Sequence, residues 1–297
     1  MRRTILHTLL PAWIAAIVLA AIAEPLRADF RHARMGPRPR AMGSAFVGVA
    51  DDANAIYWNP AGMTLVDRFE ITGCRTSLFG VAELSNDYAA AVYNTGPWLA
   101  VGISWVRLEL EDIYHEDTVN LGIARSIPRF ENLSIGAALK IFTLAAPGYE
   151  RYNDPAFEGS VNKASLDLGA LYRSPSGVWS VGAVVYNVNE PKLQLLRTTG
   201  APDPVYRDFA IGAGYTFSDL LLLSFDLRTR YGRFDDLIGR IGSEIWFFDA
   251  VALRGGFEKE NLTAGFGLKG NRWQVDLMLE THYDLGNTYQ FGLTIRL

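Results

Sequence analysis

The C-terminal stretch Tyr289-Gln-Phe-Gly-Leu-Thr-Ile-Arg-Leu297 decides the fold of this chain. Every second residue in it carries a large apolar side chain, and the residues between are polar or small. Because successive side chains of a β-strand point to opposite faces, this alternation predicts a strand with an apolar environment on one face and a polar one on the other. A β-sandwich in water and a barrel in a membrane both satisfy that pattern, so alternation alone leaves both open.

The same alternation recurs along most of the chain, most clearly in residues 273–280, 221–228 and 164–172. We predict fourteen strands, over residues 67–79, 86–93, 98–110, 117–125, 131–144, 161–173, 177–188, 206–217, 220–231, 236–247, 250–258, 261–269, 272–281 and 286–297. Fourteen is an even number, as in the barrels of bacterial outer membranes.

The connections between these strands alternate in length. Every second connection is short and rich in turn residues, as in Asn94-Thr-Gly-Pro97 and Ser174-Pro-Ser176. The two longest connections, 145–160 and 189–205, fall in the other set. Short turns at one rim and longer loops at the other are typical of outer-membrane barrels. We therefore favour an all-β fold, a transmembrane antiparallel up-and-down β-barrel of about fourteen strands over residues 67–297.

The polar face of the predicted strands collects charged side chains, and in a barrel this face lines the lumen. The lumen-facing polar residues that we predict are Asp226, Arg228, Arg230, Arg254, Asp276, Glu280 and Arg296. Glycines recur in the middle of strands on the same face, where they leave room for whatever fills the lumen. They are Gly136, Gly169, Gly182, Gly212, Gly265 and Gly292.

Composition supports the barrel and excludes other classes. The 297 residues have 20% charged and 12% aromatic side chains, and a formal net charge of −4. An apolar content of 49% argues against disorder, and without a basic excess the chain is not expected to bind nucleic acid. A single cysteine allows no internal disulfide and no multi-cysteine metal site. Aromatic residues at strand ends, Tyr93, Trp98, Tyr186, Tyr206, Phe217, Tyr231, Trp246, Phe247 and Trp273, suit the two interfacial girdles of a barrel.

The first 28 residues have the order of a secretory signal peptide. A positive start, Met1-Arg2-Arg3, precedes an apolar stretch and two small-residue sites, which predict cleavage after Ala28 or Ala23. The alternative is a retained anchor helix. The unbroken apolar run, residues 12–23, is shorter than the roughly 18–20 residues that a spanning helix needs. We therefore expect an exported protein.

Residues 34–66 do not alternate, and they carry a family resemblance. The runs Ala50-Asp-Asp-Ala-Asn-Ala55 and Tyr57-Trp-Asn-Pro-Ala-Gly62 resemble the N-terminal hatch of FadL-like outer-membrane proteins, which are the long-chain fatty-acid transporters and the related PorV/PorQ-type proteins. The stretch Arg40-Ala-Met-Gly-Ser-Ala-Phe46 is similar to the shorter PorV/PorQ-type group. The resemblance implies a fourteen-stranded barrel in the bacterial outer membrane, with residues 29–66 as a hatch inside the lumen. Its motif residues are Asp51, Asp52, Asn54, Asn59, Pro60 and Gly62.

Physical chemistry gives this segment a second interpretation beside the resemblance. Asp51 or Asp52 suits the N-cap of a short helix, and Asn59-Pro60 favours a turn before the first strand. Arg38 and Arg40 are placed to pair with inward carboxylates. Irregular backbone cannot face lipid, so the segment needs a polar lumen. The alternative is that the motif only fixes the start of the barrel and has no gating role.

No motif supports catalysis, a metal or a cofactor, and we predict a protein that is not an enzyme. His115 near Asp112, and His282 near Asp284, fall on the outer rim of the predicted barrel, where solvated loop residues are expected. They leave a rim-active outer-membrane enzyme as the remote alternative.

Two functions remain. The first is binding or passive admission of small hydrophobic molecules across the outer membrane, with outer-membrane lipid as the surroundings. The second is a PorV/PorQ-type accessory of type IX protein secretion, whose partners are secretion-system proteins. Either function would use apolar side chains on the two longest rim loops, which are Tyr149, Tyr152, Phe157, Leu193, Leu195 and Leu196. The open alternative is that these side chains pack on one another or touch lipid headgroups.

Overall fold

The computed structural model of the chain describes residues 35–96, 98–197, 202–218, 220–282 and 286–297. The predicted signal peptide, residues 29–34 of the predicted hatch, and Asp284 lie outside the described residues. The short helical elements are α2 (Pro37–Ala41), α3 (Ala55–Trp58), η1 (Pro60–Leu65) and η2 (Pro147–Tyr152).

Most of the described chain is strand. The strands are β1 (Phe69–Ser77), β2 (Leu84–Asn94), β3 (Ala100–Leu110), β4 (Tyr114–Ile127), β5 (Phe130–Ala145), β6 (Ser160–Arg173), β7 (Trp179–Tyr186), β8 (Lys192–Leu193), β9 (Asp203–Pro204), β10 (Asp208–Phe217), β11 (Leu221–Arg230), β12 (Arg233–Phe247), β13 (Val251–Glu258), β14 (Asn261–Lys269), β15 (Trp273–His282) and β16 (Gly286–Arg296).

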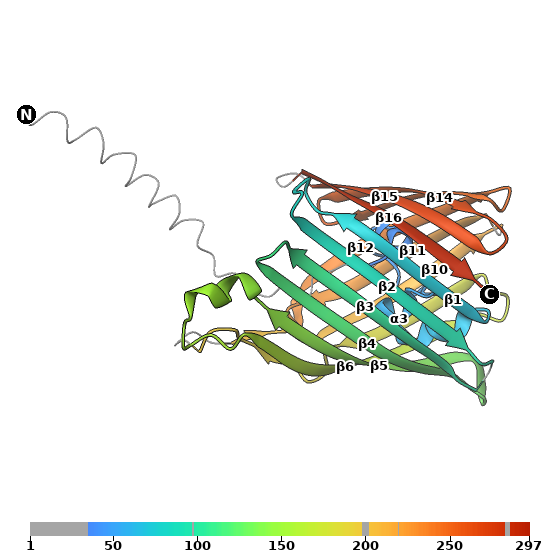
Figure 1. Cartoon of the computed structure of the whole chain (residues 1–297). Helices are drawn as coiled ribbons and strands as arrows, with labels where there is room; N and C mark the ends of the chain where they lie inside the picture. The colour runs from blue at the N-terminus through green and yellow to red at the C-terminus, as the bar shows by residue number, and fades with distance from the viewer. Residues whose placement is uncertain (1–34, 97, 198–201, 219, 283–285) are drawn as a thin grey trace, which may run out of the picture.

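Fourteen of these described strands form one closed barrel, in which each strand pairs antiparallel with its neighbour. Closure comes from β1, which pairs with β16 through Glu70 opposite Arg296 and Ser77 opposite Tyr289. The tilted ring of strands surrounds α3 and the rest of the blue N-terminal segment (Figure 1). Each barrel strand overlaps one of the fourteen predicted ranges, so the predicted fold is confirmed.

Alternation sorts the side chains as predicted. In β11, Leu223 is exposed on the outside, whereas Ser224 is buried on the inside. The outer surface carries rows of exposed Leu, Ile, Val and Phe, which soluble proteins do not display. Two of the predicted girdle aromatics face inward and not toward the membrane. Tyr186 is buried on the inner side, and Trp246 stacks under the Arg254 and Lys269 cations, because each has the inward parity of its strand.

Connection lengths also follow the prediction. Residues 128–129, 248–250 and 270–272 make short turns at the rim where the barrel begins and ends, which we name the periplasmic rim. The two longest connections lie at the opposite, outer rim, and their described residues are 146–159, 187–197 and 202–207. β8 and β9 pair with each other in the second of these loops. The alternation did not predict them, because their pairing is only two residues long.

Closure and an apolar exterior place the barrel in an outer membrane. Among the described residues, no helix is long and apolar enough to cross a membrane.

One predicted lumen residue, Arg230, does not face the lumen core. The pairing of β11 with β12 shifts register between Thr229 and Arg230, and such a bulge turns the side chains that follow it. Thr229 is therefore buried inside, and Arg230 reaches the outer rim, where its Nη1 lies 3.8 Å from Asp236. The strict alternation that we assumed for this strand was wrong at its last residue.

Replacing Leu121 with arginine tests the outward assignment. Leu121 is exposed on the outer face near the middle of β4, so Leu121→Arg puts a charge into hydrocarbon and we expect it to cost about 2–4 kcal/mol. The measurement is guanidinium unfolding of the barrel in lipid vesicles. The control is Ile113→Arg, an equally exposed position in a rim loop, which we expect to leave stability nearly unchanged. Equal costs at both positions would contradict the assignment.

Candidate functional site

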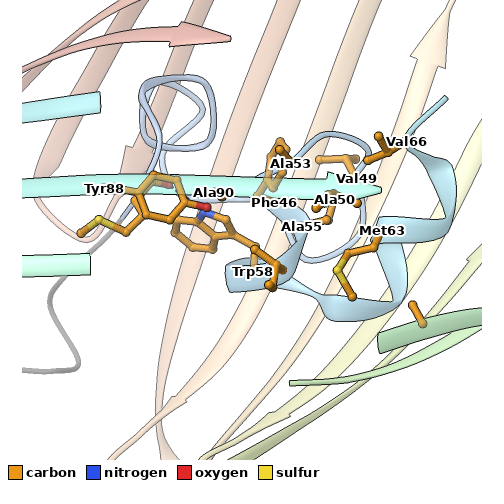
Figure 2. Packing of buried hydrophobic residues seen from close by; sticks show 14 of the residues in the cluster. Phe46, Val49, Ala50, Ala53, Ala55, Trp58, Met63, Val66, Tyr88 and Ala90 are labelled. Atoms are coloured by element: carbon orange, nitrogen blue, oxygen red, sulfur yellow. Dashed lines mark hydrogen bonds between the residues drawn. The ribbon is translucent and has the colours of Figure 1, made fainter. Parts of the chain in front are cut away.

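The candidate site is the lumen together with residues 35–66, which we name the inner segment. Nearly every residue of the inner segment is buried. Phe46 and Trp58 pack edge to face with ring centroids 6.4 Å apart, and Trp58 donates from Nε1 to the Met35 carbonyl. Figure 2 shows this apolar cluster meeting the inward Tyr88 and Ala90 of β2. The inner segment therefore supplies the hydrophobic core of the barrel. Its role as a hatch stays a prediction.

Inward glycines let the backbone of the inner segment approach the strands closely. Gly136 and Gly169 face each other across β5 and β6, and a Cβ at either would overlap Pro60. Every other glycine that we predicted on this face meets the inner segment or a side chain bound to it. Their neighbours are Val47 at Gly182, Gly48 and Asp226 at Gly212, Ala41 at Gly265, and Pro37 at Gly292. The expectation that these glycines leave room in the lumen is confirmed.

Inward polar side chains complete the hydrogen bonds of this irregular backbone. Asp226 accepts from the amides of Phe46 and Val47 at 2.8 and 2.9 Å. Glu70 accepts from the Ala53 amide, and the Tyr186 hydroxyl donates to the Trp58 carbonyl. A buried backbone group without a partner costs roughly as much as a lost hydrogen bond. These side chains therefore hold the inner segment in one conformation.

Ion pairs form a second set of links between the inner segment and the strands. Arg38 donates to both carboxylate oxygens of Glu244 and also to Asp51 and Asp52. Burial by itself lowers the pKa of the Arg38 guanidinium, but attraction to the three carboxylates outweighs it and raises that pKa well above its usual range. Arg40 also forms an ion pair with a strand residue, Glu280.

Beyond the contacts with the inner segment, further ion pairs lie along the inner face of the strands. Arg254 donates to Glu244 at 2.6 Å and to Asp276 at 2.7 Å, and Arg296 donates to Glu70 at 2.8 Å. Arg228 pairs with Asp208 at 2.9 Å. Six of the seven predicted lumen residues therefore lie in the lumen, with Arg230 as the exception.

The predicted motif residues all belong to the inner segment, but their roles differ from the predicted helix cap. The N-cap residue of α3 is Asn54, and its side chain makes no capping hydrogen bond. The Asp52 carboxylate accepts from the backbone amide of Asn54 itself at 2.9 Å, and not from an amide inside the helix. The same carboxylate also accepts from Arg38. Asp51 likewise pairs with Arg38 instead of capping.

Asn59 is the most connected motif residue. Its amide nitrogen donates to the carbonyls of Val47 and Ala170, and its oxygen accepts from the Ala61 amide. Pro60 begins η1 as expected of a turn before β1. A Cβ on Gly62 would overlap the Ala50 carbonyl, so this position accepts only glycine. The motif therefore ties the two halves of the inner segment to each other and to β6.

The two long outer-rim loops meet above the lumen. Phe157 and Leu196 form an isolated antiparallel β-bridge. Beside it, the Glu158 amide donates to the Leu195 carbonyl, and the Arg197 side chain forms an ion pair with Glu158. Tyr149 packs with Tyr152 and Phe157, with ring centroids 5.3 and 5.0 Å apart.

The predicted rim residues thus form two groups. Tyr152 is exposed, whereas Leu193 is buried with Phe142, Leu144 and Val205, because the β8–β9 pair turns it toward the lumen. In these two loops, the exposed side chain among the predicted rim residues is therefore an aromatic one.

Within the described ranges, no three His, Cys, Asp or Glu side chains come together in a way that could hold a metal ion. His115 lies 3.7 Å from Asp117, and His282 packs edge to face on Phe79.

Glu70 and Glu244 were missed among the lumen residues, although both hold the inner segment. Each has the polar parity of its strand, so the alternation contained the signal. What the sequence did not contain is which inward charge meets the inner segment.

Comparison with known proteins gives the fold a name. No protein-family model and no curated protein sequence matches the chain. Among solved structures, the toluene transporter TbuX of Ralstonia pickettii matches with a TM-score of 0.60 and 16% identity, over 90% of this chain and 98% of that one. The chain folds as a FadL-like barrel.

Two further matches agree with this. The monoaromatic hydrocarbon channel CymD matches with a TM-score of 0.64 and 13% identity, over 90% of this chain and 99% of that one. A FadL homologue of Pseudomonas aeruginosa matches with a TM-score of 0.58 and 11% identity, over 86% of this chain and 96% of that one. The similarity covers most of the chain.

A valine at Gly136 tests the close fit of the inner segment. Its side chain would overlap Pro60 and Ala61, and we expect Gly136→Val to cost about 1–3 kcal/mol and to loosen the inner segment. The measurement is tryptic cleavage after Arg40 in the folded barrel, which we expect to become faster. Gly239→Val is the control, because Gly239 faces outward and a Cβ there has only Leu227 near, at 3.9 Å. The fit is refuted if both variants resist trypsin as the wild type does.

Proposed function

We propose that this protein passively admits small hydrophobic molecules across the outer membrane. The observation that carries the proposal is the match along almost the full length to channels described as monoaromatic hydrocarbon channels and toluene transporters. A passive channel also needs no cofactor and no catalytic group.

The aromatic cluster of Tyr149, Tyr152 and Phe157, in which Tyr152 is exposed and the other two are half-buried, supports the proposal. Aromatic side chains at the outer rim offer an apolar surface to a hydrophobic molecule that arrives from water. Below them, the lumen is occupied by the inner segment and its ion pairs. An apolar molecule gains nothing from buried charges, so passage requires the inner segment to move away from part of the barrel. In this proposal the inner segment is the hatch that opens and closes the path.

A disulfide between the inner segment and the barrel tests this motion. Thr64 of η1 and Ser134 of β5 have hydroxyl oxygens 2.7 Å apart, so cysteines at both positions are close enough to bond. In a Cys74→Ala background, we expect the oxidised Thr64→Cys/Ser134→Cys variant to lose uptake of radiolabelled toluene and oleate by intact cells. Reduction should restore it. The single Thr64→Cys variant is the control.

Each outcome of that experiment decides something. Uptake by the unmodified protein that does not exceed an empty-vector control removes the channel. Full uptake by the oxidised double variant keeps the channel but refutes motion of the inner segment against β5 as its opening step.

A secretion accessory of PorV/PorQ type is the second candidate. It is favoured by the two rim loops, which bind each other and present Tyr152 outward as a protein would present a contact residue. The discriminating experiment is binding of a purified C-terminal sorting domain of a type IX cargo to wild type and to Tyr152→Asp. Binding that Tyr152→Asp abolishes, without hydrocarbon uptake, would favour this candidate.

A further inference from the structure

The outer face of β14, β15, β16 and β1 carries an apolar depression of about 720 Å³. The apolar side chains that line it from the outward face are those of Ala264, Phe266, Leu277, Leu279, Tyr289 and Phe291. Ala264 is small beside its neighbours, and it lies in register with Leu279, which lies in register with Tyr289. The larger side chains therefore form walls around a low floor.

A cation stands at one end of this depression. Arg75 of β1 lies in register with Phe291 and belongs to the lining. Its side chain is 71% exposed, and with the described residues it makes one bond, from Nη1 to Asp87 at 3.2 Å. A guanidinium has five donors in a planar fork that matches phosphate, so most of the Arg75 donors remain open to a ligand.

The register shows that Arg75 marks a boundary on the outer surface. On one side of it, the same row across the sheet is apolar, through Phe291, Leu277 and Phe266. On the other side the row continues as Asp87, Arg107 and Asp117, in which Arg107 pairs with Asp117 at 2.8 and 3.0 Å.

A row of paired residues climbs the barrel because the strands are tilted. Charges on the outer face are expensive in hydrocarbon, so this row leaves the hydrocarbon at β1. Arg75, two residues before the end of β1, accordingly lies at headgroup depth on the side of the outer rim.

We propose that this depression binds a phosphorylated, acylated lipid of the outer leaflet, with an acyl chain over Ala264 and a phosphate against Arg75. The apolar walls and the terminal guanidinium match the two ends of such an amphiphile. The site lies on the outside of the barrel, so it does not depend on the proposed channel.

Native mass spectrometry of the delipidated, refolded barrel tests the site, with hexa-acylated bisphosphorylated lipid A as the probe. We expect Arg75→Glu to weaken binding of lipid A by about tenfold or more, because it replaces charge-assisted bonds with repulsion. Arg75→Lys should retain a part of the affinity. Ala264→Trp, which fills the floor, should weaken lipid A and its dephosphorylated form alike.

Matched controls separate the site from general lipid contact. Arg233 is an exposed rim arginine that pairs with Asp235, and Ala183 is an outward alanine of β7. We expect Arg233→Glu and Ala183→Trp to bind lipid A as the wild type does. Resistance of each folded barrel to unfolding in detergent checks its assembly.

The results then divide cleanly. Losses at Arg75 and Ala264 without losses at the controls support the site. Lipid A affinity within twofold of wild type in both Arg75→Glu and Ala264→Trp overturns it. A loss in Ala264→Trp alone, or equal affinity for dephosphorylated lipid A, overturns phosphate recognition by Arg75.

Discussion

The rest of the structure depends on one constraint, which is that the irregular backbone of the inner segment must find hydrogen-bond partners inside a barrel. Lipid surrounds the strands, so those partners come from inward side chains. Asp226 is the clearest case, since one buried carboxylate accepts from two successive amides, those of Phe46 and Val47. Polar residues on the inner face and glycines beside them are two answers to the same constraint. One supplies partners, and the other allows the backbone to come near enough to use them.

This constraint also explains the composition of the chain. The charged side chains are concentrated where they meet the inner segment or one another, as at Arg38, Glu244 and Arg254, and the outer surface is left to apolar residues. Charges in the row from Arg75 to Asp117 also face outward, and they lie near the outer rim. The net charge of −4 therefore describes the arrangement poorly, because opposite charges are paired and sorted by face.

Much of the fold could be predicted from the sequence. A strand with lipid on one face and a polar interior on the other shows apolar and polar residues in alternation, because successive side chains point to opposite faces. The prediction was weaker where tertiary contacts overrule the period. A bulge turned Arg230 to the rim. Tyr186, by contrast, follows the inward period of its strand, so its girdle assignment was wrong because it considered only the position at the strand end. The predicted strand 177–188 is shorter in the structure, Trp179–Tyr186, because Asn187 instead donates its amide to Asp167. The site was predictable as a class of residues, inward charges and glycines, but not as pairs, since pairing depends on how the inner segment folds.

The central claim, that inward side chains of the barrel hold the inner segment, is tested most directly by amide hydrogen exchange at Phe46 and Val47 in wild type and in Asp226→Ala. The account predicts slow exchange in the wild type and exchange faster by about tenfold or more in the variant, because both amides lose a charged acceptor. Fast exchange in the wild type, or equal protection in the two proteins, would contradict it.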